Sequence, residues 1–67
     1  MKFQVTFFNE ENKYKPVAAI IEADTRTEVI NGKWKTARAK VCIKRGWTIK
    51  EMTQDYGYSI WKYRKAE

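Results

Sequence analysis

The sequence predicts an α+β fold in which one long helix packs on one face of a small three-stranded sheet. Segments near both ends of the chain alternate apolar and polar residues, as half-buried strands do. The segment between them repeats apolar residues every three or four positions, as an amphipathic helix does. The expected order is β-β-α-β, in an antiparallel or mixed sheet. Because the chain has 67 residues, we expect residues 1–67 to form a single small basic domain.

The first two strands are predicted to form a hairpin. Residues 2–8 alternate, and the alternation resumes over residues 15–23, where Pro16 is confined to a strand start or an edge. The polar run NEENK at 9–13 is typical of the turn between them. The positions expected to face the core are Phe3, Val5, Phe7, Val17, Ala19 and Ile21.

A helix is predicted over residues 26–45. Thr25 and Glu28 have the spacing of a capping box at its start, and Gly46 stands where a helix C-cap is expected. Its apolar residues recur at helical spacing and form one stripe, which we expect to be buried. The stripe consists of Ile30, Trp34, Ala37 and Val41.

The dipeptide Asn31-Gly32 leaves an alternative open, because Asn-Gly between apolar segments is a strong signal for a β-hairpin turn. Under this alternative the segment would contain two short strands and a shorter helix beginning at about residue 36. We favour the long helix, since a glycine inside a helix costs only about 1 kcal/mol and the apolar stripe continues on both sides of Gly32.

The C-terminal third predicts a short helical turn and a third strand. Thr48 and Glu51 repeat the capping-box spacing, so residues 48–55 are expected to be helical, with a strand as the alternative. Residues 58–65 alternate again, with Trp61 and Tyr63 expected on the core side. We expect this strand to lie beside the first one, which gives the order 2-1-3.

The far side of the long helix is less polar than a solvent-exposed face should be. The residues concerned are Val29, Thr36, Ala39, Cys42 and Ile43. We expect the segment around Ile49 and Met52 to fold back onto this side. A second chain is the alternative, and for that reason both a monomer and a homodimer stay open.

The net charge is +6 and it is unevenly distributed. Residues 1–31 hold four basic and five acidic residues, whereas residues 32–67 hold ten basic and three acidic ones. A positive field of this kind favours a polyanionic partner. The partner that we expect is nucleic acid, DNA rather than RNA, and the alternative is an acidic protein surface.

One face of the predicted sheet is left uncovered by the helix, and it is both basic and aromatic. Lysine and arginine contact phosphates, and aromatic rings stack on bases, so the mixture suits nucleic acid. Lysines on one flank of the helix offer a second basic surface. The candidate nucleic-acid-binding residues are Lys2, Phe8, Tyr58, Lys62 and Arg64 on the sheet and Lys33, Lys40 and Lys44 on the helix. The alternatives are a solvated sheet face and lysines whose stems lie over the sheet edge.

Other chemistries are disfavoured by the residues that the chain lacks. There is no histidine and one cysteine, Cys42, so neither a disulfide within the chain nor a zinc site of the usual kind is expected. Cys42 is expected to be a small buried residue. No catalytic signature is present, and we expect neither an enzyme nor a cofactor. Because no signal peptide and no run of about 18 apolar residues occurs, we expect a cytoplasmic protein without a membrane partner.

Overall fold

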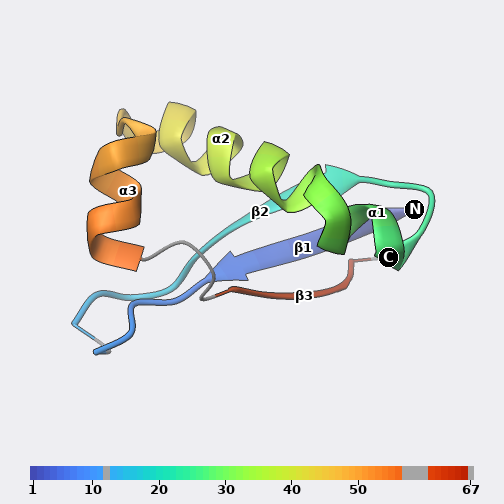
Figure 1. The fold of residues 1–67 in the computed structure, drawn as a ribbon, viewed down its shortest axis with the longest axis horizontal. Coiled ribbons are helices and arrows are strands. Elements are labelled where there is room, and N and C mark those ends of the chain that lie inside the picture. The colour runs from blue at the N-terminus through green and yellow to red at the C-terminus, as the bar shows by residue number, and fades with distance from the viewer. Residues whose placement is uncertain (12, 57–60, 67) are drawn as a thin grey trace.

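The computed structural model describes residues 1–11, 13–56 and 61–66, which form a sheet with helices on one side of it (Figure 1). The elements are β1 (Lys2–Phe7), β2 (Val17–Glu22), α1 (Arg26–Glu28), the π-helical turn η1 (Val29–Lys33), α2 (Trp34–Arg45), α3 (Ile49–Tyr56) and β3 (Trp61–Lys65). The three strands are antiparallel and have the order β2-β1-β3. The predicted α+β fold and strand order are therefore confirmed.

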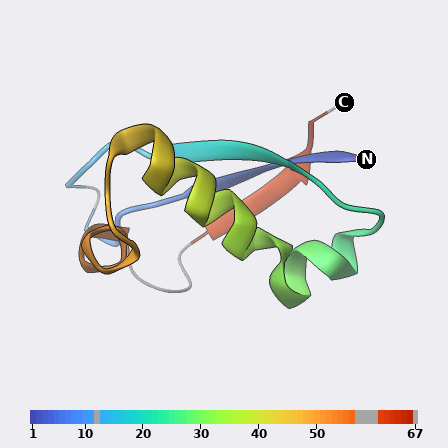
Figure 2. The ribbon, with the colours of Figure 1, turned by 90° about the horizontal axis from the view of Figure 1, so that it is seen from above.

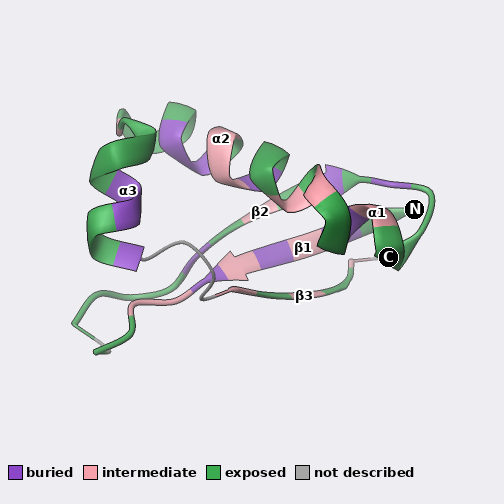
Figure 3. Cartoon of the chain, in the orientation of Figure 1, coloured by how far each residue is buried: buried purple, intermediate pink, exposed green. Residues whose placement is uncertain are grey.

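The central strand β1 pairs with both of the other strands. Val5 lies opposite Ala19 of β2 and opposite Tyr63 of β3, so the residues that share its face of the sheet come from all three strands. This face is the core side, with Phe3 and Val5 fully buried (Figure 3). The predicted alternation is correct in the described part of all three strands. Residues 58–60 of the predicted last strand lie outside the described residues.

The turn between β1 and β2 is organised by Asn9 and attached to α3. The Asn9 side-chain oxygen accepts a hydrogen bond from the Glu11 backbone N–H at 3.1 Å, as in an Asx turn, and a second one from the Lys13 backbone N–H at 2.8 Å. The Asn9 side-chain amide donates to the Asp55 carbonyl. The Tyr56 hydroxyl donates to the Lys15 carbonyl at 2.9 Å. These contacts tie the C-terminal end of α3 to the hairpin.

Helical structure continues from residue 26 to residue 45, which excludes the hairpin alternative at Asn31-Gly32, but the path bends at Gly32. The Trp34 N–H donates to the Val29 carbonyl, five residues earlier, instead of the usual four. Val29 therefore takes the place in the buried stripe that a regular helix gives to Ile30. Val29 is 0% exposed and Ile30 is 52% exposed. The prediction that Ile30 belongs to the core is wrong, whereas Ala37 and Val41 are buried as predicted.

The predicted helix caps are present. The Thr25 hydroxyl oxygen accepts a hydrogen bond from the Glu28 N–H at 3.3 Å. Thr48 and Glu51 form a full capping box, since each N–H donates to the other side chain, at 3.0 and 3.1 Å. Gly46 ends α2 with a φ of 69°, a left-handed conformation that favours glycine. Residues 49–56 are helical, so the strand alternative for this segment is excluded.

The helix α2 crosses the sheet diagonally (Figure 2). Ala37 and Ala19 have small side chains, which allow α2 to approach β2 closely. At the N-terminal end of α2, Trp34 stacks on Trp61 of β3 with ring centroids 5.2 Å apart and an angle of 20° between the planes. The helix is thus fixed to both edges of the sheet, by small residues at β2 and by a pair of indoles at β3.

Part of the far side of α2 is covered by α3. The Met52 sulfur lies 3.5 Å from the Cys42 sulfur, and both residues are buried. This confirms the expected fold-back at Met52. Ile49, which was expected to join this contact, is 40% exposed, and Ile43 is 83% exposed. The segment covers only the C-terminal part of that side because its eight residues span little more than two helical turns.

None of the helices in the described ranges combines the length with the apolar character that a membrane crossing requires.

A matched pair of variants can test whether Val29, and not Ile30, belongs to the buried stripe of the helix. Val29→Ala should lower the free energy of unfolding by about 2 kcal/mol, because it removes buried methyl groups and leaves a cavity. Ile30→Ala should change it by less than about 0.5 kcal/mol, because the side chain is half exposed. Urea unfolding followed by tryptophan fluorescence measures both values. A larger loss for Ile30→Ala would show that the turn has four residues and not five.

Candidate nucleic-acid interface

The side of the sheet that the helices leave uncovered carries the even-numbered residues of the three strands. The strand register arranges these residues in rows across the sheet. One row is Ile20, Gln4 and Arg64, and the next is Ala18, Thr6 and Lys62. We call this surface the open face. In these two rows the basic side chains stand on β3, and the small and apolar ones stand on β2.

Arg64 and Lys62 are held in place on the open face by neighbours from β1 and the residue after it. The Gln4 side-chain oxygen accepts two hydrogen bonds from the Arg64 guanidinium, one from Nε at 3.1 Å and one from a terminal nitrogen at 2.8 Å. The Lys62 ammonium lies 5.9 Å from the centroid of the Phe8 ring. These residues, with Thr6 and Tyr63, line a hollow of about 310 Å³. The two cations therefore stand in defined positions at the rim of a shared hollow.

Lys2 lies on the same face, opposite Glu22 of β2. Four of the predicted site residues, Lys2, Phe8, Lys62 and Arg64, are thus gathered on one side of the molecule. Tyr58, the fifth sheet residue in the prediction, lies outside the described residues.

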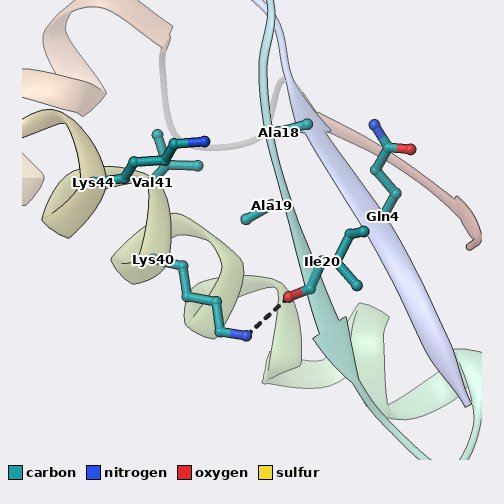
Figure 4. Close-up of a pocket in the computed structure, with 7 residues that line it drawn as sticks. All are labelled: Gln4, Ala18, Ala19, Ile20, Lys40, Val41 and Lys44. Atoms are coloured by element: carbon teal, nitrogen blue, oxygen red, sulfur yellow. Dashed lines mark hydrogen bonds between the residues drawn. The ribbon is translucent and has the colours of Figure 1, made fainter.

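The three helix lysines are not gathered in one place. The Lys40 ammonium donates a hydrogen bond to the Ile20 carbonyl at 2.9 Å, so its stem lies over the edge of β2, as the alternative interpretation expected. Lys40 and Lys44 both line a groove of about 470 Å³ at that edge (Figure 4). Lys33 lines a different hollow, together with Glu22, Asp24 and Glu28. Its acidic surroundings make Lys33 a poor phosphate contact.

The other basic side chains of α2 pack on aromatic rings. The Arg38 guanidinium lies 5.1 Å from the centroid of the Trp34 ring. The Arg45 guanidinium lies 5.6 Å from that of Trp47. Cation–π contacts of this kind extend the core outward and contribute to the stability of the fold.

Gln4 is a candidate site residue that the sequence-based list of candidates omits. It lines both the hollow at β3 and the groove at β2, so it connects the two sides of the open face. The alternation of β1 places Gln4 on this face. Its contact with Arg64, however, joins residues 60 positions apart and depends on the register of β1 with β3.

Cys42 is buried, as predicted, and is poorly suited to thiol chemistry. Burial raises the pKa of its thiol, against a lowering by Arg38, and Glu51 adds to the rise. The reactive thiolate is therefore disfavoured. Within the described residues, no group of three or more cysteine and acidic side chains is arranged to hold a metal ion.

No protein-family model, no curated protein and no solved structure matches this chain.

The raised pKa of Cys42 predicts a loss of stability at alkaline pH. The folded state holds the thiol proton more tightly than the unfolded chain does. The stability that this gives is complete below the ordinary pKa of a cysteine thiol and is lost as pH rises through the raised pKa of the folded state. Tyr56, whose pKa burial also raises, acts in the same direction at higher pH. Urea unfolding at neutral and alkaline pH should show a smaller loss for Cys42→Ala than for the unchanged protein. An equal loss in both would show that the thiol is not the group responsible.

Proposed function

We propose that this protein binds nucleic acid, DNA rather than RNA, through the open face of its sheet. The observation that supports the proposal is the position of Lys62 and Arg64, which stand on the uncovered face beside Lys2 while the helices occupy the other side. The protein would act as a non-enzymatic accessory or regulatory module in the cytoplasm. The net charge of +6 would supply the long-range attraction to a polyanion.

Phosphate contact is the chemistry to which the two β3 cations are best suited. Lys62 and Arg64 are two residues apart on one strand, so they point the same way at a spacing of about 6.7 Å. Gln4 orients the Arg64 guanidinium, and this lowers the entropy that is lost when the side chain meets a phosphate. Each side chain would then neutralise a separate phosphate and release its counterion.

The dimensions of the sheet favour duplex DNA. The axes of the adjacent strands β1 and β3 lie about 4.8 Å apart, and the major groove of B-DNA, about 12 Å wide, admits a two-stranded ribbon. The deep, narrow major groove of an RNA duplex does not admit such a surface. Gln4 and Thr6 would lie at the centre of the contact, with Phe8 at its end and the cations of β3 on the phosphate backbone. Such contacts position the protein and carry little sequence information.

The proposal is tested by the salt dependence of DNA binding. For B-DNA the logarithm of the affinity falls with the logarithm of salt concentration, with a slope of about −0.9 for each phosphate contacted. The double variant Lys62→Ala/Arg64→Ala should reduce the steepness of this slope by about 1.8 and weaken binding by about tenfold to a hundredfold at low salt. Fluorescence anisotropy of a labelled duplex between about 50 and 200 mM salt measures both quantities.

The matched control is Arg26→Ala/Lys50→Ala, which removes the same two residue types from α1 and α3. Both side chains are exposed and belong to the helical layer. This variant should keep the slope of the unchanged protein. Equal losses in the two double variants would mean that only the net charge matters, and an affinity insensitive to salt would exclude the proposal.

A further inference from the structure

We propose that the outer edge of β2 binds an extended acidic peptide segment, which adds a fourth strand to the sheet. The site is the groove of about 470 Å³ at the outer edge of β2, lined by Lys40 and Lys44 of α2 on one side and by Ala18 and Ile20 of the open face on the other (Figure 4). It lies at the opposite edge of the sheet from Lys62 and Arg64. The inference does not rest on the proposed binding of nucleic acid.

The backbone of β2 offers hydrogen-bonding groups to an added strand. In the part of the chain that the structure describes, β2 lies at an edge of the sheet. The Ala23 N–H donates to the Met1 carbonyl at 3.0 Å, so the odd-numbered residues of β2 are the ones that pair with β1. The backbone groups of Ala18 and Ile20 therefore point outward. Peptides add to sheet edges by pairing with outward groups of this kind.

One of these outward backbone groups, the Ile20 carbonyl, already accepts a hydrogen bond from Lys40. Its ammonium donates to the Ile20 carbonyl at 2.9 Å, which shows that a donor can reach this carbonyl from outside the sheet. A carboxylate is a stronger partner for an ammonium than a neutral carbonyl is. An incoming acidic strand can thus take over the Ile20 carbonyl with its own N–H while Lys40 turns to a carboxylate of that strand.

The positions of Lys40 and Lys44 select an acidic strand. The two lysines are four residues apart on α2, which corresponds to about 6 Å along the helix axis. Alternate residues of a strand are about 6.7 Å apart and point to the same side. Acidic residues at two alternate positions are therefore spaced closely enough for the flexible lysine side chains to reach both of them. A second copy of the chain would bring two more lysines to the same edge, and the like charges would disfavour pairing.

The open-face side of the groove determines which residue types are preferred between the acidic residues of the bound peptide. These residues would point to the open face, beside Ala18 and Ile20. Ile20 is 51% exposed, and the small side chain of Ala18 leaves room next to it. A β-branched apolar residue fits this position, because cross-strand apolar pairs stabilise a sheet. The preferred ligand is thus an extended segment in which acidic and β-branched apolar residues alternate.

Two blocked peptides test the inference, one of alternating glutamate and valine and one of alternating lysine and valine. The first should bind the full chain at least about tenfold more tightly, because only its charges complement the two lysines. Hydrogen exchange followed by nuclear magnetic resonance should show the amides of Ala18 and Ile20 becoming protected. Methylating alternate backbone nitrogens on one edge of the first peptide should abolish this protection.

A second test reverses the charge of the two lysines. Lys40→Glu/Lys44→Glu should bind the lysine–valine peptide in preference to the glutamate–valine peptide. Arg26→Glu/Lys50→Glu has the same net charge and should keep the original preference. Equal binding of the two peptides, or protection at β3 in place of β2, would overturn the inference. It would also be overturned if the protein alone forms dimers in which the Ala18 and Ile20 amides are already protected, since a second copy would then be the occupant.

Discussion

The pairing of β1 with both neighbouring strands is the interaction on which the rest of the structure depends. Its odd-numbered residues, Phe3, Val5 and Phe7, form the centre of the core. Its even-numbered residues, including Gln4 and Thr6, form the centre of the open face. One strand thus supplies both the main apolar contribution to folding and the middle of the surface to which we assign binding, because successive side chains of a strand point to opposite faces.

A domain of this size buries only about 60% of the surface that its unfolded chain exposes, so its core is small. Aromatic contacts at the margins of the core extend it. Trp34 stacks on Trp61, and Trp47 stacks on Tyr56 with ring centroids 5.9 Å apart. The arginine side chains of α2 lie over two of these indoles. Part of the positive charge of α2 is therefore used in packing.

Placing the helices on one side of the sheet leaves two kinds of surface. The open face has cations that stand on the strand β3 itself. The β2 edge has outward backbone groups, with cations that reach over it from α2. The first surface suits phosphates and the second suits an extended acidic chain, and Gln4 lines both. A ligand on one surface therefore lies within reach of residues that contact a ligand on the other.

The sequence alone determined the strands, the helix ends and the two faces of the sheet. These features follow from local rules: the two-residue period of a strand, and the hydrogen bonds by which Thr48 caps the third residue after it. The tertiary structure decided which residues of the long helix are buried and which side chains the lysines and arginines contact. Ile30 and Val29 exchange roles because the turn before Trp34 contains five residues, a change that a regular period of 3.6 cannot anticipate. The contact of Arg64 with Gln4 joins distant segments, and only strand register and packing bring such segments together.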